Sequence, residues 1–410
     1  MSPANGAVYK PPLRPRRFLL FAIIASSVGL LAGVALMEVV FRILERRENS
    51  HSVYEGSGGL WMEDGRWGWK PSLGAFRSVT SEFDVTGNIN SLYMNDVSTD
   101  PIEDERKTRV FVLGDSHTYA VGVSMQQTWP RLLEGGLNLA KGQNTFRVYN
   151  GGVTGFNIHQ YLLRLIDQGP LIHPDYVVVG LSYATDLYDL LPPDRGGWIY
   201  GGDRPRDYFD FNAEGELTER HWTTNMTPRG GSSGASTTAA GVRQILEYSA
   251  TFRRLRRSKL SLFVGSHLTI KGQSLWPNMD IVLEKEVGEE HRYQWRLFEA
   301  LLSRMKDECD RQGAKLIVVG IPYLPQVYDD VWDSTFGRDP KYSRTAGAER
   351  VESYCKKLNI PYVDTLLAFQ ARTKKVGHWL HFPVDAHPTA EGHEVIASAL
   401  MNAGLIHSKE

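Results

Sequence analysis

Short continuous apolar runs alternate with amphipathic segments through most of the chain after residue 107. Continuous apolar runs are typical of buried parallel strands, and apolar residues at three- and four-residue spacing are typical of helices packed on a sheet. This alternation predicts an α/β fold with a mainly parallel sheet and helices on both faces. We expect strands that end at Gly114 or cover 146–149, 175–181, 315–321 and 361–363, and helices over 128–139, 158–168, 289–312 and 348–358 and from about residue 389.

Residues 18–40 form an apolar run that is long enough to cross a bilayer, interrupted only by Glu38 near its end. The run predicts one transmembrane helix in contact with the lipid bilayer. A cleaved signal peptide is the alternative, but the apolar core of a signal peptide is usually shorter. We therefore expect a cytoplasmic tail at 1–17, an uncleaved anchor at 18–40, and an extracytoplasmic location for the large domain at the cell membrane.

Two further segments depart from the α/β pattern. Residues 41–106 read as a linker and edge segment of short strands or loops, in which Trp67 and Trp69 cover a sheet edge rather than stack on a sugar. The main domain spans 107–407, with an insertion at about 192–290. The insertion holds a Gly- and Ser-rich tract at 229–238 and an arginine-rich helical pattern at 242–268, for which an anionic membrane surface, an acidic polymer and plain solvent are all open as neighbours.

Charge and cysteine content narrow the classes of function. The chain has 46 basic and 47 acidic residues among 410, so no overall positive field favours nucleic acid as a partner. The two cysteines, Cys309 and Cys355, fit buried free thiols better than a disulfide, although the pairing stays open. Neither their spacing nor any other motif predicts a metal or organic cofactor.

Polar residues follow three of the predicted strands where each strand ends. Gly114-Asp115-Ser116 follows the first strand, a glycine-rich loop from Asn150 to Asn157 follows the second, and Ser182 to Asp186 follow the third. Carboxyl ends of parallel strands meet at one edge of a sheet, where ligands bind. Ser116 is our candidate nucleophile at this edge; the alternative is a serine that only caps a helix.

A C-terminal loop supplies the partners that a serine nucleophile needs. Asp385 and His387 stand two residues apart just before the last predicted helix, so the carboxylate can orient the imidazole while the ring faces the serine. The alternative is a turn led by aspartate with a surface histidine. His378, His381 and His393 lie near this loop, but their spacing matches no metal motif that we recognise.

The same blocks provide donors for a tetrahedral oxyanion: the N–H groups of Ser116 and Gly155 and a side chain near Thr185. Losing one such donor typically costs about 3 to 4 kcal/mol of transition-state stabilisation.

Together, the blocks GDSH at Ser116, NGGVTG at Gly155, the polar cluster at Thr185 and DAHP at His387 resemble the SGNH (GDSL-like) hydrolase superfamily, and they span about residues 108–400. The resemblance implies a three-layer flavodoxin-like fold and a serine esterase or O-acyltransferase. It implies Ser116 as nucleophile, Asp385 and His387 as the rest of the triad, and Ser116, Gly155 and Thr185 as the oxyanion hole. Asp115, His117 and Asn157 are then expected beside the substrate.

The resemblance is to a bacterial membrane-anchored branch linked to acylation of cell-surface polysaccharide, which predicts a small acyl ester of a carbohydrate, with acetyl first, as substrate. One departure is Thr185, which stands where the family usually has asparagine. A threonine hydroxyl reaches less far, so Asn157 or Ser182 could take its place, or activity could be reduced. The competing hypothesis is a catalytically degenerate domain that serves as a binding or assembly subunit with a membrane protein partner.

Overall fold

The computed structural model describes residues 26–30, 32–33, 35–42, 53–56, 59–97, 106–142, 144–183, 185–192, 204–223, 279–383 and 385–409. Contacts within the chain divide it into two units, residues 1–50 with 236–256 and residues 51–235 with 257–410. In the first unit, all of the described residues are helical, and Arg42 pairs with Glu38 at 2.8 Å. Within the described part of the chain, no helix has the length and apolar composition needed to cross a bilayer. Parts of the 18–40 run lie outside the described residues, so the membrane helix stays a prediction.

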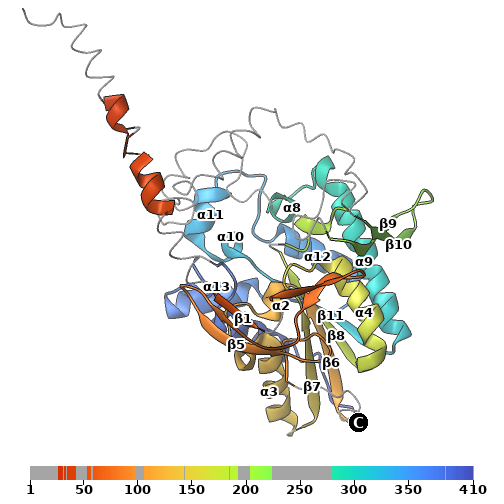
Figure 1. Ribbon diagram of the computed structural model, residues 1–410. Coiled ribbons are helices and arrows are strands. Elements are labelled where there is room, and N and C mark those ends of the chain that lie inside the picture. The colour runs from red at the N-terminus through yellow and green to blue at the C-terminus, as the bar shows by residue number, and fades with distance from the viewer. Residues whose placement is uncertain are drawn as a thin grey trace, which may run out of the picture. The chain divides into compact units, whose positions relative to one another are not determined.

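The second unit is built on a five-stranded parallel sheet (Figure 1). Its strands run in the spatial order β12-β11-β8-β6-β7, and each neighbouring pair is parallel. Counted along the chain this order is 2-1-3-4-5, the flavodoxin-like order, with a switch point between β6 and β8. The predicted parallel sheet is confirmed. The strands are β6 (Thr108–Gly114), β7 (Phe146–Gly152), β8 (Tyr176–Ser182), β11 (Lys315–Ile321) and β12 (Tyr362–Asp364).

Helices cover both faces of this sheet, because successive strand residues point to opposite sides. In β8, Val177 and Val179 belong to one apolar cluster while Val178 belongs to the other. In Figure 1, α4 and α9 lie together on one side and α3 lies on the other. The first cluster includes side chains of α4 (Ile158–Ile172), α9 (Glu289–Arg311) and α12 (Ala346–Lys357); the second includes those of α3 (Trp129–Lys141), α10 (Leu324–Val327), α11 (Asp329–Thr335), α13 (Leu366–Val376) and α14 (Ala390–Asn402).

Cys309 on α9 and Cys355 on α12 are both free and fully buried in the first cluster. Burial raises the pKa of Cys355 to about 12 and that of Cys309 still further, so neither is a thiolate near neutral pH. These thiols act as small apolar side chains, as expected for buried free cysteine.

The segment before β6 forms small antiparallel sheets, as the sequence suggested. Its strands are β1 (Val53–Gly56), β2 (Trp61–Asp64), β3 (Gly68–Pro71), β4 (Gly74–Val79) and β5 (Asp84–Ile89), paired as β1-β4-β5 and β2-β3. Trp67 and Trp69 are 7% and 4% exposed, so neither presents a ring to a sugar. Trp69 packs edge-on against Phe156, and the Trp67 indole N–H donates to Asp167 of α4. They therefore cover α4 and the loop before it, and the prediction of a sheet edge was wrong in this detail.

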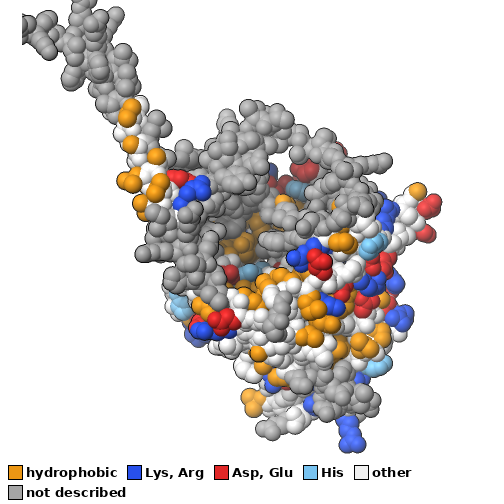
Figure 2. All heavy atoms as spheres, viewed as in Figure 1, with side chains coloured by type: hydrophobic (Ala, Val, Ile, Leu, Met, Phe, Trp, Pro, Cys, Tyr) orange, Lys and Arg blue, Asp and Glu red, His pale blue; other side chains and the backbone are white. Residues whose placement is uncertain are grey.

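Residues 204–223 of the predicted insertion form a hairpin of β9 (Arg206–Phe211) and β10 (Leu217–Trp222). Gly215, at φ +83°, makes the turn between them. The tract at 229–238 and the arginine-rich segment at 242–268 lie outside the described residues. After them, α8 (Asp280–Leu283) leads into α9. On the face drawn in Figure 2, the described acidic and basic side chains are intermixed, in line with the net charge of −1.

Candidate active site

The short helix α2 (Ser116–Tyr119) lies over the ends of β6, β7 and β8, and glycines make room for it. A Cβ at Gly114 would overlap the Thr118 hydroxyl, and one at Gly180 would lie 2.5 Å from the same oxygen. A Cβ at Gly152 would lie 2.6 Å from the carbonyl carbon of Thr118. Glycine at these positions therefore lets the turn that carries Ser116 sit directly on β6, β7 and β8.

Asp115 caps this helix, and Ser116 is its first residue. Asp115 Oδ1 accepts the backbone N–H of His117 at 2.8 Å. The interpretation of Ser116 as the helix cap was therefore wrong, because the aspartate before it has that role. The Ser116 hydroxyl is not needed as a cap and is therefore available for another hydrogen bond, although the residue is only 7% exposed.

Ser116, His387 and Asp385 form one hydrogen-bonded row across 271 residues of chain. His387 Nε2 lies 2.7 Å from Ser116 Oγ, and His387 Nδ1 lies 2.5 Å from Asp385 Oδ1. Burial opposes ionisation of Asp385, but the hydrogen bond and charge of His387 outweigh it and lower the pKa of this carboxyl. An ionised carboxylate can only accept, so Nδ1 carries the imidazole proton and Nε2 is free to accept the serine O–H.

A tight loop before α14 presents Asp385 and His387. His381 pairs with Pro388 in a β-bridge, the Phe382 N–H donates to the His387 carbonyl at 2.9 Å, and Thr389 caps α14. Between the two polar residues, Ala386 has φ +70°, a conformation that an L side chain rarely adopts. The loop holds both side chains on the Ser116 side only while its surroundings maintain this conformation.

Two backbone donors are available near Ser116. Within the described residues, the N–H groups of Ser116 and Gly155 have no acceptor. The loop that carries Gly155 is tied to the end of β6, because the Val153 N–H donates to the Gly114 carbonyl at 3.0 Å. Gly155 itself has φ +78°, which favours glycine. Both N–H groups therefore follow the carboxyl ends of β6 and β7 and can donate to a ligand.

The Thr185 hydroxyl does not complete this set. It donates to Asp115 Oδ2 at 2.7 Å, and a hydroxyl has only one proton to give. Thr185 therefore supports the Asp115 carboxylate in this structure, in contrast to the oxyanion role expected from the sequence.

Asn157 and Ser182, the two residues considered as substitutes for Thr185, do not supply a donor either: Asn157 makes other hydrogen bonds, and Ser182 is buried. Asn157 caps α4 through its carbonyl oxygen, and its amide donates to the Asp189 carbonyl at 2.7 Å. Ser182 is fully buried. Asn157 is likewise only 2% exposed, so the structure gives it a capping role instead of the predicted substrate contact.

Asp115 and His117 form a second imidazole–carboxylate pair beside Ser116. His117 Nδ1 lies 3.2 Å from both Asp115 oxygens. Burial works against ionisation, but the charge of His117 and its hydrogen bonds, together with the Thr185 hydroxyl, lower the pKa of Asp115. Asp115 and His117 are 1% and 3% exposed, so neither offers the surface that the predicted substrate contact requires. The His117 ring lies 5.0 Å from that of His387, tilted by 51°.

The other histidines near the loop are dispersed. His378 is exposed and pairs with Glu391 at 2.6 Å. His381 accepts a hydrogen bond from the Tyr328 hydroxyl at 2.8 Å, and His393 accepts one from the Trp129 N–H. Burial is the main reason that the pKa values of His381 and His393 fall to about 3, so both are neutral.

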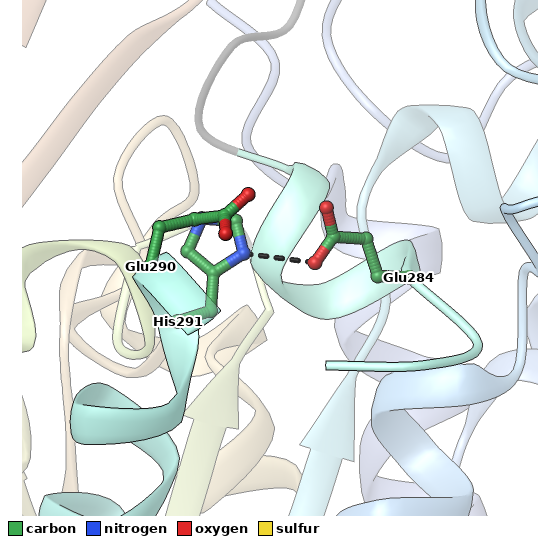
Figure 3. A group of neighbouring side chains, drawn as sticks. All are labelled: Glu284, Glu290 and His291. Atoms are coloured by element: carbon green, nitrogen blue, oxygen red, sulfur yellow. Dashed lines mark hydrogen bonds and ion pairs between the residues drawn. The ribbon is translucent and has the colours of Figure 1, made fainter. Parts of the chain in front are cut away.

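One group among the described residues has ligand atoms close enough to share a metal ion: Glu284, Glu290 and His291 (Figure 3). It lies at the junction of α8 and α9, and it includes none of the histidines of the C-terminal loop. Glu284 already accepts from His291 Nδ1 at 2.9 Å. This pairing accounts for the group as an ordinary ion pair with a neighbouring carboxylate.

No protein-family profile matches the sequence, and the comparison with curated proteins found no match. Among solved structures, the chain is similar to Axe2, an acetylxylan esterase from Geobacillus stearothermophilus, with 15% identity, a TM-score of 0.38, and coverage of 74% of this chain and 97% of that one. It is also similar to TesA, with 14% identity, a TM-score of 0.36, and coverage of 72% and 96%. At these values the similarity identifies no function by itself.

Proposed function

We propose that this chain is a serine esterase or O-acyltransferase of the SGNH type, with Ser116 as nucleophile, His387 as base and Asp385 as its orienting carboxylate. The observation that carries the proposal is the row of hydrogen bonds from Ser116 Oγ to His387 Nε2 at 2.7 Å and from His387 Nδ1 to Asp385 at 2.5 Å. A serine hydroxyl becomes a useful nucleophile when a base removes its proton and a carboxylate steadies the resulting imidazolium.

The reaction proceeds in two halves. Ser116 Oγ attacks the ester carbonyl while its proton passes to His387 Nε2. The N–H groups of Ser116 and Gly155 donate hydrogen bonds to the oxyanion that forms. The intermediate collapses, the leaving alcohol takes the proton from His387, and the acyl group stays on Ser116. Water or a sugar hydroxyl then gives its proton to His387 and takes the acyl group, and His387 returns that proton to Ser116 Oγ as the bond between Oγ and the acyl group breaks. The chemistry of this row needs no metal or organic cofactor.

The substrate class follows from the sequence resemblance: a small acyl ester, acetyl in the first place, of a carbohydrate. The near-complete burial of Ser116, at 7% exposed, also favours a small acyl group. The bulky part of the substrate is then its alcohol, which stays outside the enclosed nucleophile.

We further propose that residues 18–40 anchor the protein in the cell membrane, with residues 107–407 extracytoplasmic. Support comes from the apolar sequence of this segment and from the exposure of its described side chains, with Val28, Leu30 and Leu36 at 60%, 71% and 65%. Apolar side chains exposed on a helix are stable in lipid but not in water. Retention of the full-length protein in membranes washed with alkaline carbonate, and protease digestion of its domain only from the extracytoplasmic side, test this arrangement.

The full-length chain in mild detergent tests the reaction. We expect release of p-nitrophenol from p-nitrophenyl acetate, less from the hexanoate ester, and acetate from an acetylated oligosaccharide. Ser116→Ala removes the nucleophile and abolishes all three. A folded wild-type protein without activity on any of them contradicts the proposal.

One observation favours a second function. Thr185 is bonded to Asp115, so the oxyanion hole has backbone donors but no side-chain donor among the predicted residues. A domain weakened in this way can serve as a binding or assembly subunit of a membrane complex. That function predicts co-purification with a membrane protein in wild type and Ser116→Ala alike; a protein that runs alone in mild detergent excludes it.

A further inference from the structure

The loop between β4 and β5, residues 80–83, has a defined conformation. The Thr80 N–H donates to the Phe83 carbonyl at 2.8 Å, and the Thr80 hydroxyl accepts the N–H groups of Glu82 and Phe83 at 3.1 and 3.3 Å. These bonds fix the turn within the hairpin itself. The backbone positions of Glu82 and Phe83 are therefore fixed by the hairpin alone, independently of contacts with other segments.

This turn contacts the loop that carries Asp385 and His387. A carboxylate oxygen of Glu82 accepts the backbone N–H of Asp385 at 2.7 Å. Next to this bond, the rings of Phe83 and Phe382 lie 5.3 Å apart at 54°. The hairpin thus binds the start of the loop at two points, one polar and one apolar.

The same two rings also meet the turn that carries the nucleophile. A Cβ built on Gly122 would lie 2.5 Å from the Phe382 ring and 2.8 Å from the Phe83 ring. Gly122 lies just beyond α2, at φ +82°. Three segments that are remote in sequence, the hairpin, the end of α2 and the Asp385 loop, therefore meet in one packed contact.

The Asp385 loop needs this support because Ala386 is strained at φ +70°. A residue in such a conformation persists only where surrounding contacts enforce it. A backbone N–H that donates to a carboxylate makes a stronger hydrogen bond than one that donates to a neutral oxygen. Loss of the Glu82 acceptor would release the N–H of the residue whose side chain orients His387.

We infer that Glu82 is a positioning residue for the triad: by accepting the Asp385 N–H, it fixes the loop and so holds Asp385 and His387 in line with Ser116. The inference rests on the proposed function. Glu82 itself touches none of the three reacting side chains through this bond. Its effect is on the fraction of molecules in which His387 Nε2 stands ready beside Ser116 Oγ.

Glu82→Ala and Glu82→Gln in the full-length chain test the inference, because glutamine keeps an acceptor oxygen and alanine does not. A displacement of about 1 Å in a catalytic group can cost about 100-fold in rate, so we expect kcat of Glu82→Ala for p-nitrophenyl acetate to fall about 10- to 100-fold with KM changed much less. Glu82→Gln should recover most of kcat. Glu63→Ala is the matched control, since Glu63 is exposed on β2, in the separate β2-β3 sheet, and has no polar partner among the described residues.

A second measurement does not depend on turnover. The Nδ1 proton of His387, bonded to Asp385, should give a far-downfield proton resonance that is absent from His387→Gln. We expect it to be present in wild type, Glu82→Gln and Glu63→Ala, and broadened or lost in Glu82→Ala. An inactive wild type contradicts the proposed function while this resonance still tests the inference. Unchanged kcat and resonance in Glu82→Ala, or equal losses in Glu82→Ala and Glu82→Gln, overturn it.

Discussion

The Thr185 hydroxyl donates to Asp115 Oδ2 at 2.7 Å, so the side chain expected to serve an oxyanion instead supports a buried carboxylate. Asp115 is 1% exposed and in turn binds both the backbone and the ring of His117. Thr185 therefore supports the residue that precedes Ser116, and its substitution should affect stability more than chemistry.

Thr185→Val tests this assignment with a side chain of the same shape. We expect kcat for p-nitrophenyl acetate to fall by less than about 100-fold, the lower limit for loss of an oxyanion donor. The unfolding free energy should fall by about 1 to 3 kcal/mol, because Asp115 loses a hydrogen bond in a buried site. Urea denaturation and steady-state kinetics measure the two effects. A kcat loss of 1000-fold with unchanged stability would restore Thr185 to the oxyanion hole.

The two imidazoles beside Ser116 should differ sharply in their effect on catalysis. Only His387 reaches Ser116 Oγ, so His387→Gln should lower kcat by about four to six orders of magnitude. His117 faces Asp115, and His117→Asn, which keeps an N–H donor, should cost less than about 100-fold, the lower end for loss of a proton-transfer group. Single-turnover acylation rates measure both. Equal losses would mean that His117 shares the role of base.

Much of this fold could be predicted from local sequence, because strands that are buried on both faces read as continuous apolar runs. The run at 315–321 became β11 with the same bounds, and the helix predicted at 289–312 ends at Arg311. The hairpin at 206–222 was missed, since the glycines and low-complexity sequence around it dominated the interpretation. Its turn, with Gly215 after a run rich in aromatic residues, carried a usable signal.

The candidate site likewise has features that local sequence predicts and features that it does not. Asp385 and His387 are close in sequence, and Ser116 follows the end of a strand, so local sequence patterns identify all three as candidates. The contact of Glu82 with Asp385 spans 303 residues and has no local pattern. The bond between Thr185 and Asp115 depends on a rotamer that only packing decides. Long-range hydrogen bonds of this kind follow from the assembled sheet, and one sequence does not reveal them.

Two glycines provide a matched test of the packing beneath α2. A Cβ at Gly152 would overlap backbone atoms of Thr118 and Tyr119, so Gly152→Ala must displace the turn that carries Ser116. We expect a loss of about 1 to 3 kcal/mol in unfolding free energy, as for other overpacked sites, together with a lower kcat. Gly135→Ala in α3 has open space around it and should be neutral or stabilising by up to about 1 kcal/mol. A Gly152→Ala protein with wild-type stability and activity would show that α2 does not rest on this strand end.

Buried neutral histidines should make stability depend on pH. Burial, with a smaller contribution from nearby His117 and His387, lowers the pKa of His393 from 6.5 to about 3. Above pH 6.5 the imidazole is neutral in both the folded and unfolded states. As pH falls from 6.5 towards 3, the unfolded state binds a proton that the folded state does not, so the unfolding free energy falls by up to about 1.4 kcal/mol per pH unit.

Because buried carboxyls such as Asp186, whose pKa burial raises, act in the opposite direction, the difference between proteins isolates the histidine. Urea denaturation at pH 7.5 and pH 5 should show a smaller loss of stability for His393→Gln than for wild type, whatever the absolute stability of each. His407→Gln, at an exposed position, should follow wild type. If His393→Gln and wild type lose the same free energy between these pH values, His393 is protonated in the folded state, and its buried site tolerates the charge.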